Sequence, residues 1–219
     1  MRKVFLSVML LGKINPDDPT IYTSEDFDLG AKQFTFPLSY LIDANVQKDD
    51  TVSIITAVEQ GEDGKINNAQ ENYQAYMAEI NDIVRDRNVQ IEFSEIALTK
   101  DFDSLTFNKF FKQVADLIKD DDLLFSDITF GMKPYSFSMF IALAYATKAA
   151  KNVDVDTVIY SQKYTGFSRP QNPQEAKLNP SKARIYDLTG LFYLNALAGS
   201  AKPGQKTNLD KALGLIIPD

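Results

Sequence analysis

The stretch that decides the fold runs from residue 123 to residue 150 and reads LLFSDITFGMKPYSFSMFIALAYATKAA. It opens with an apolar segment, Leu123 to Thr129, whose length is typical of a buried strand. Gly131 follows, and Pro134 then begins a long apolar segment that ends at Ala150. Proline is tolerated in the first turn of a helix, because the N–H that it lacks would have no partner there. The pattern predicts a strand, a tight turn and a helix.

The same alternation of strands and helices extends through most of the chain. Candidate strands are rich in β-branched residues, and candidate helices repeat apolar residues every three or four positions. We predict further strands at Val4–Leu11, Thr51–Val58, Gln90–Leu98 and Thr157–Ser161, and helices at Phe34–Ile42, Ala69–Arg87 and Phe107–Ile118. Strands that alternate with helices form right-handed crossovers within a parallel sheet. The predicted fold class is therefore α/β, with a Rossmann-like, mostly parallel sheet flanked by helices.

The C-terminal part of the chain breaks this alternation. Tyr164–Ala183 contains three prolines among polar residues and is predicted as a loop, as is the Pro- and Asp-rich segment Asn15–Thr23. Ile185–Ala198 resumes an apolar pattern with helical spacing, and residues 199–208 resemble a linker before a short apolar end at 209–217. We predict a Rossmann-like domain at residues 1–165, extended by a loop, a helix and a tail at residues 166–219.

Composition excludes several kinds of chemistry. The 219 residues include 23 Lys and Arg against 30 Asp and Glu, a net charge of −7, and no Cys, His or Trp. Without Cys and His the chain has no disulfide, no thiolate or imidazole metal ligand and no Ser-His-Asp triad. We expect no metal and no cofactor. The acidic balance argues against binding long nucleic acids.

The N-terminal apolar run does not predict a membrane or export segment. It is short, and no small-residue cleavage site precedes the acidic pair Asp17-Asp18. We expect a cytoplasmic protein that does not enter a membrane.

Four lysines follow predicted strands. In open parallel sheets, ligands bind at the carboxyl ends of the strands, where loops meet helix N-termini. Such a basic edge on an acidic protein suits a phosphate-bearing ligand. Gly12 and Lys13 come after the first strand, and Lys100, Lys133 and Lys163 come after later ones. For Lys100 we prefer the simpler interpretation of an ordinary exposed lysine.

The segment from Asp127 to Lys133 is the most specific feature. Free backbone N–H groups at the helix start, together with the helix dipole, can cradle an anion, and Thr129 and Lys133 add a hydroxyl and a charge. The segment is neither a Walker loop nor the dinucleotide Gly-x-Gly-x-x-Gly motif. A purely structural interpretation remains open, in which Asp127 and Thr129 cap the turn and Gly131 supplies a positive φ.

The piece Asp-Ile-Thr-Phe-Gly-Met-Lys-Pro, followed by an apolar helix and Val-Ile-Tyr, resembles the signature of CRISPR-associated Rossmann fold (CARF) proteins. Within them it is similar to the branch that carries Asp-x-Thr-x-Gly-x-Arg/Lys after the fourth strand. The later segment Ile-Tyr-Asp-Leu-Thr-Gly-Leu, residues 185–191, also resembles that branch, and the likeness covers residues 1–198 in element order. The chain departs from the family at Phe130, where a polar residue is common, and in the first loop, which offers only Ser7 before Leu10-Leu11-Gly12.

The resemblance implies a sensor of cyclic oligoadenylate, the ring of four or six nucleotides made by type III CRISPR complexes. Such domains form homodimers with the ring across the interface, so that two copies of Thr129, Gly131 and Lys133 meet a symmetric ligand. Either Phe130 or Tyr135 is expected to stack on adenines. The other candidate ligand contacts are Asp127 and Met132 in the same segment, and Gly12, Lys13 and Lys163, which follow predicted strands.

Three functions stay open. The first is a sensor whose effector domain is missing or separate, since the family's HEPN ribonuclease motif Arg-x-x-x-x-His cannot occur in a chain without His. The second is a stand-alone, metal-independent ring nuclease. In it a ribose 2′-hydroxyl attacks its own phosphate, and Lys133, as the catalytic residue, stabilises the added charge to give a linear product with a 2′,3′-cyclic phosphate. The third is an unrelated nucleotide- or sugar-phosphate-binding Rossmann enzyme with Asp127 as base. The sequence favours the first narrowly over the second.

Overall fold

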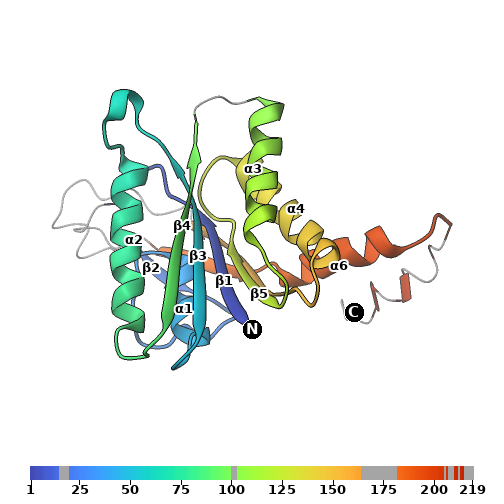
Figure 1. Cartoon of the computed structure of the whole chain (residues 1–219). Helices are drawn as coiled ribbons and strands as arrows, with labels where there is room; N and C mark the ends of the chain where they lie inside the picture. The colour runs from blue at the N-terminus through green and yellow to red at the C-terminus, as the bar shows by residue number, and fades with distance from the viewer. Residues whose placement is uncertain are drawn as a thin grey trace.

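The computed structural model describes residues 1–14, 20–99, 103–163 and 182–204, together with residues 206, 210, 211, 213 and 214. Within this part of the chain, seven strands form one sheet with helices on both faces (Figure 1). The strands are β1 (Arg2–Val8), β2 (Ile21–Thr23), β3 (Thr51–Glu59), β4 (Gln90–Leu98), β5 (Asp122–Asp127), β6 (Asp154–Lys163) and β7 (Lys182–Asp187). The helices are α1 (Pro37–Asn45), the 3-10 helix η1 (Glu62–Gly64), α2 (Asn68–Val84), α3 (Ser104–Leu117), α4 (Lys133–Ala149) and α6 (Thr189–Ser200).

The order of the strands creates a reversal at the centre of the sheet. The order is β2-β7-β6-β5-β1-β3-β4, and the five strands from β6 to β4 are parallel. The chain moves from β1 outward to β3 and β4, and then crosses to the other side of β1 to form β5 and β6. Ligand crevices in sheets of this kind form at such a switch point, outside the carboxyl ends of the two strands where the direction reverses. Here those strands are β1 and β5.

Two hydrophobic cores cover the two faces of the sheet. One lies beneath α1 and α2, and the other lies beneath α3, α4 and α6 (Figure 1). Strand β1 contributes to both: Phe5 packs in the first, stacked on Phe125 with ring centroids 4.7 Å apart, while Leu6 and Val8 pack in the second. The continuous apolar run near the N-terminus is thus a central strand covered on both faces, and the predicted Rossmann-like α/β class is confirmed.

The predicted helix at Ile185–Ala198 is wrong at its start. Residues Lys182–Asp187 form β7, which is antiparallel to β6, and the helix begins only at Thr189. Ala183 and Ile185 are both buried, so the burial pattern there has the period of two that a strand requires. The Asp187 carboxylate accepts the Thr189 N–H at 2.8 Å, and this turn separates the two elements.

The last part of the predicted loop Asn15–Thr23 is also a strand. Ile21–Thr23 forms β2, which pairs with β7 at the edge of the sheet. A strand of three residues leaves little pattern in the sequence, and only pairing with β7 defines it. Residues 164–181 of the other predicted loop, together with residue 100, lie outside the described residues, as does much of the tail beyond residue 204.

The other predicted elements are present with shifted ends. The first helix begins at Pro37 and not at Phe34, and β1 ends at Val8 instead of Leu11. Within the described residues, no helix combines the length and the apolar character that a membrane span requires.

Candidate functional site

The loop after β5 lies directly against the end of β1. Ser7 of β1 and Asp127 of β5 are register partners, and Gly131 approaches Val8 just beyond them. Gly131 has a φ of +82°, and a Cβ atom built on it would lie 2.3 Å from Val8 Cγ1. Both the left-handed backbone and the close approach therefore require glycine here. The loop that the sequence singled out closes over the switch point.

Asp127 is buried and organises this loop. Its side chain accepts the Thr129 N–H at 2.8 Å, and it is only 2% exposed. Burial raises its pKa to about 6, while hydrogen bonds from the hydroxyl and the N–H of Thr129 oppose the rise. The carboxylate thus faces the protein and not the solvent.

Thr129 connects the loop to the neighbouring strand. Its Oγ1 accepts the N–H of Ser161 of β6 at 2.7 Å, and its own N–H and hydroxyl bond Asp127. The residue is half-buried. Its side chain is therefore committed to holding β5, the loop and β6 together, in agreement with the structural interpretation that the sequence left open.

The start of α4 presents backbone donors and one lysine. Met132 is the N-cap residue and makes no side-chain cap, while its carbonyl accepts the N–H of Tyr135 at 2.9 Å. Lys133 is exposed, and its Nζ lies 5.3 Å from the centroid of the Tyr160 ring on β6. No Asp or Glu among the described residues forms an ion pair with Lys133. An uncapped helix start beside a cation is an environment suited to an anion.

The two aromatic residues predicted to stack on adenines, Phe130 and Tyr135, differ from each other in how accessible their rings are. Tyr135 is 2% exposed, and its ring packs edge-on against Phe107 and Phe110 with centroids 5.2 Å and 5.1 Å away. The structure does not support Tyr135 as a stacking residue, because the core already encloses its ring. Phe130 is half-buried and packs against the core beneath α1 and α2, so part of its ring remains accessible.

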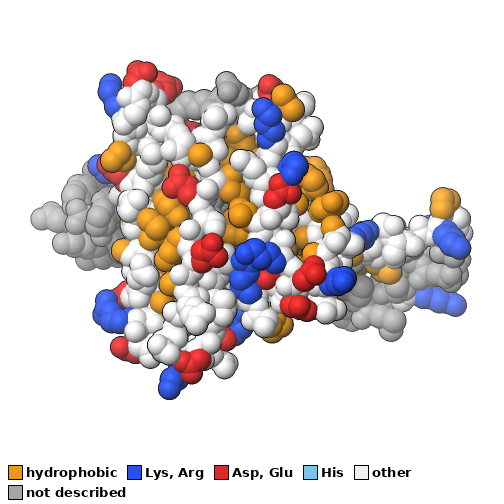
Figure 2. All heavy atoms as spheres, viewed as in Figure 1, with side chains coloured by type: hydrophobic (Ala, Val, Ile, Leu, Met, Phe, Trp, Pro, Cys, Tyr) orange, Lys and Arg blue, Asp and Glu red, His pale blue; other side chains and the backbone are white. Residues whose placement is uncertain are grey.

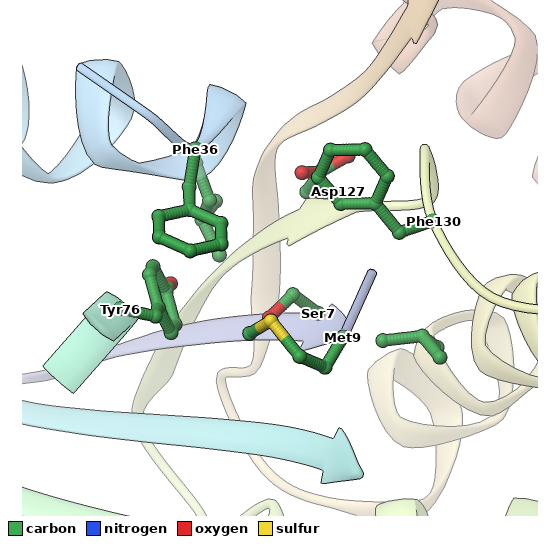
Figure 3. Close-up of a pocket in the computed structure, with 8 residues that line it drawn as sticks. Ser7, Met9, Phe36, Tyr76, Asp127 and Phe130 are labelled. Atoms are coloured by element: carbon green, nitrogen blue, oxygen red, sulfur yellow. The ribbon is translucent and has the colours of Figure 1, made fainter. Parts of the chain in front are cut away.

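A small cavity lies beneath the loop (Figure 3). Its volume is about 10 Å³, at the lower limit of what one water molecule occupies. It is lined by residues at the end of β1, at the start of α1, on α2, at the end of β5 and in the following loop: Ser7, Val8, Met9, Phe36, Leu38, Tyr76, Asp127 and Phe130. The hydroxyls of Ser7 and Tyr76 are buried without a hydrogen-bond partner of good geometry. Burial and the charge of Asp127 raise the pKa of Tyr76, and the neighbouring Ser7 hydroxyl opposes the rise.

Asn72 of α2 holds the loop after β1, which contains the predicted contacts Gly12 and Lys13. Its side-chain amide donates to the carbonyls of Leu10 and Gly12, each at 2.8 Å, and Lys13 is exposed. Asn72 is not among the residues predicted from the sequence, although a polar residue beside the apolar stripe of a helix is a visible signal. Tyr76 lies within the predicted helix Ala69–Arg87, and nothing in its spacing there indicates that it lines a cavity together with Asp127.

The remaining lysines add little to the described site. Lys163 ends β6 and pairs with Ala183 through the backbone, while the placement of its side chain and of Lys100 lies outside the described residues. Among the described residues, no three Asp or Glu side chains gather in a way that could hold a metal ion.

The fold and the site together define a class: a doubly wound α/β protein in which a glycine-containing loop at an uncapped helix start covers the switch point of the sheet. No protein-family model matches the chain, and no curated protein matches it. Among solved structures, one similar chain is Enterococcus italicus Csm6 bound to cyclic hexa-2′-fluoro-hexa-dAMP, with 12% sequence identity and a TM-score of 0.45. The match covers 99% of this chain and 54% of that chain, so the protein described here spans about half the length of that Csm6.

Proposed function

We propose that this chain is a cyclic oligoadenylate-binding sensor domain of a type III CRISPR antiviral response, which binds the ring across a homodimer interface. One observation carries the proposal: the loop Asp127–Lys133 lies over the switch point and presents the uncapped start of α4 beside Lys133. These same residues carry the resemblance to CARF proteins.

The charge distribution supports a small, phosphate-bearing ligand. The chain carries a net charge of −7, which disfavours extended contact with a long polyanion. At the start of α4, however, backbone donors, the helix dipole and Lys133 act at one place. A cyclic nucleotide brings a few phosphates to that place without covering the acidic remainder of the surface.

An apolar stripe on α4 supports the homodimer. Phe137, Ile141 and Tyr145 are spaced by four residues on one helix face and are 67%, 42% and 53% exposed. Leu105 at the start of α3 is exposed as well. Figure 2 shows exposed hydrophobic side chains on the side of the molecule that carries α3 and α4. Exposed apolar residues that share one helix face are suited to an interaction surface.

The position of the stripe relative to the site favours a second copy of this chain as the partner. Phe137 lies about one helical turn after Lys133, so the stripe begins next to the anion-binding end of α4. A two-fold axis through this end would bring two copies of Lys133 toward one ring.

Binding of the purified chain to cyclic tetra-adenylate and cyclic hexa-adenylate tests the proposal. We expect one ring per dimer by isothermal titration calorimetry, and Lys133→Ala should weaken binding by about tenfold or more, the usual effect of losing a charge-assisted contact to phosphate. Lys112→Ala is the matched control, since Lys112 is an exposed lysine on α3 paired with Asp116. Absence of binding to either ring, or normal binding by Lys133→Ala, would refute the proposal.

A metal-independent ring nuclease is the second candidate. Lys133 favours it, because an exposed lysine that forms no ion pair with an acid among the described residues can stabilise the charge that develops on a phosphate attacked by its own 2′-hydroxyl. Conversion of the ring to linear species with a 2′,3′-cyclic phosphate, lost in Lys133→Ala, would establish this function. If the ring stays intact after prolonged incubation, the nuclease is refuted and the sensor remains as the proposed function.

The third function predicted from the sequence, an enzyme with Asp127 as its base, is not supported. The Asp127 carboxylate is 2% exposed and accepts the Thr129 N–H, so it does not face a ligand at the strand ends. A general base must reach the proton that it removes.

A further inference from the structure

The Asp127 carboxylate has no positively charged partner among the described residues. Its register neighbours on β1 and β6, Ser7 and Ile159, carry no charge. The titratable groups that sense its charge are two phenols, Tyr76 of α2 and Tyr22 of β2. Burial, and then the charge of Asp127, raise the pKa of both. An ionised carboxylate at this position therefore depends on neutral hydrogen-bond donors.

Glu79 of α2 is the other acid that acts on these phenols, and it is already satisfied. Its carboxylate accepts the N–H groups of Thr35 and Phe36 and the hydroxyl of Ser39. The Glu79 carboxylate adds negative charge to the region and does not neutralise the charge of Asp127. The donors available to Asp127 therefore decide in which form it persists.

Two of those donors line the cavity beside Asp127. Ser7 Oγ and Tyr76 OH are both buried and both line the cavity (Figure 3). The two hydroxyls interact closely enough for Ser7 to lower the pKa of Tyr76, but within the described part of the chain neither has a hydrogen-bond partner of good geometry. The cavity has room for about one water molecule. A water there can donate to the second oxygen of Asp127 and accept from both hydroxyls, which would satisfy all three groups.

The other oxygen of Asp127 controls the loop. It accepts the Thr129 N–H, the Thr129 hydroxyl also bonds the carboxylate, and Thr129 Oγ1 in turn accepts the Ser161 N–H of β6. Hydrogen bonds to an ionised acceptor are about twice as strong as those to a neutral one. Protonation of Asp127 therefore weakens the bonds that fix the backbone immediately before Gly131 and α4.

We infer that Asp127 is a positioning residue: its ionised carboxylate, solvated by the Ser7 and Tyr76 hydroxyls and a water in the cavity, holds the loop over the switch point, and its protonation releases that loop. The inference rests on the proposed function only in treating this loop as the ligand site. Burial raises the pKa of Asp127 to about 6, so both forms are populated at mildly acidic pH.

A nuclear magnetic resonance titration of the free protein from pH 4.5 to 8 tests the inference without any ligand. The backbone amides of Thr129, Gly131 and Ser161 should titrate with one common midpoint near pH 6, and this transition should be absent in Asp127→Asn. The inference is overturned if the three amides titrate with different midpoints, or with a common midpoint near 3.8, the usual pKa of an aspartate.

Variants of the cavity hydroxyls supply the matched comparison. Tyr76→Phe and Ser7→Ala each remove a hydroxyl that would donate to the cavity water beside the ionised carboxylate. Each should raise the midpoint, by about 0.5 pH units or threefold in the ionisation constant. Thr56→Val is the control: Thr56 Oγ1 is also buried without a partner and lies beside Ser7 on β3, but it does not line the cavity. Equal midpoints in all three variants would contradict a role for the cavity.

Affinity for cyclic hexa-adenylate connects the loop to ligand binding. With a midpoint near 6, about a quarter of the protein is ionised at pH 5.5 and nearly all at pH 7.5, so the ring should bind about fourfold more weakly at pH 5.5. Asp127→Asn should bind equally at both values. If the ring binds the natural chain equally at pH 5.5 and pH 7.5, the link between Asp127 and ligand binding is refuted. If the ring does not bind at any pH, the proposed function is refuted, and the titration of the free protein alone decides the inference.

Discussion

Replacing Gly131 by alanine should destabilise the protein through two separable effects. The backbone at this residue has a φ of +82°, which costs an alanine about 1 kcal/mol relative to glycine. The new Cβ would also lie 2.3 Å from Val8 Cγ1, so the loop or β1 has to move by about 1 Å to restore ordinary contact. Overpacking of this kind costs about 1–3 kcal/mol. We therefore expect a loss of about 3 kcal/mol in the free energy of unfolding.

Urea denaturation of matched variants measures these two effects. Gly30→Ala is the control for the backbone alone, because Gly30 has a φ of +66° and nothing within 4 Å of its built Cβ. Val8→Ala removes Cγ1, the nearest atom to the new Cβ, and leaves Val8 Cβ at 3.0 Å, so the cost of Gly131→Ala should fall by about 1–2 kcal/mol in that background. Two results would refute the reasoning. One is that Gly131→Ala lowers the free energy of unfolding no more than Gly30→Ala does; the other is that its effect is the same in the natural and the Val8→Ala background. In either case, the close approach of the loop to β1 is not the reason that glycine is needed at residue 131.

Three further predictions concern charge and association. Burial raises the pKa of Asp127 from 3.8 to about 6, so protonated Asp127 contributes its full stability below about pH 3.8 and this contribution is lost as pH rises through 6. In urea denaturation, the free energy of unfolding of the natural chain should therefore fall by about 2 kcal/mol between pH 4 and pH 7, relative to that of Asp127→Asn. Arg2→Met should cost about 3 kcal/mol in urea denaturation, since it leaves the buried Asp122 without the guanidinium that bonds both its oxygens at 2.9 Å and 2.6 Å. Phe137→Glu should convert the proposed dimer to a monomer in analytical ultracentrifugation, because it places a charge in the apolar stripe.

Matched controls distinguish these effects from general damage. Arg85→Met removes a pair on the exposed surface of α2 and should change stability by less than about 0.5 kcal/mol. Ile66→Glu alters an equally exposed apolar residue away from α4 and should leave association unchanged. The reasoning about Arg2 is contradicted if the two arginine variants lose the same stability. A monomeric natural chain, or a dimeric Phe137→Glu, contradicts the proposed interface, and parallel pH profiles for the natural chain and Asp127→Asn contradict the burial argument.

The strands, the helices and the loop over the switch point could be predicted from local patterns. Continuous apolar runs predicted the buried strands, and the residues around Asp127–Lys133 predicted a strand, a turn and a helix. The strands β2 and β7 could not be predicted in this way. The β2 strand has three residues and β7 precedes a helix of similar composition, so pairing partners far along the chain define both.

The direction in which a side chain points was the second limit. Thr129 and Tyr135 follow the strand end as ligand contacts would, yet Thr129 bonds β6 and Tyr135 lies in the core against α3. Spacing places residues at one end of a sheet, but burial decides which of them reach solvent. The exposed stripe on α4 shows the same limit, because its apolar residues looked like core residues in the sequence.

By itself, the sequence determined the α/β class, the absence of imidazole and thiol chemistry, and the one loop that carries glycine, threonine and lysine beside a helix start. Those properties depend on residue types and short spacings. Only the tertiary structure decided that Asp127, Ser7 and Tyr76 share a cavity, that Gly131 lies against Val8, and that Lys133 is left exposed. The physical reason is that these contacts join β1, α2 and β5, which are brought together when the chain crosses back over the centre of the sheet.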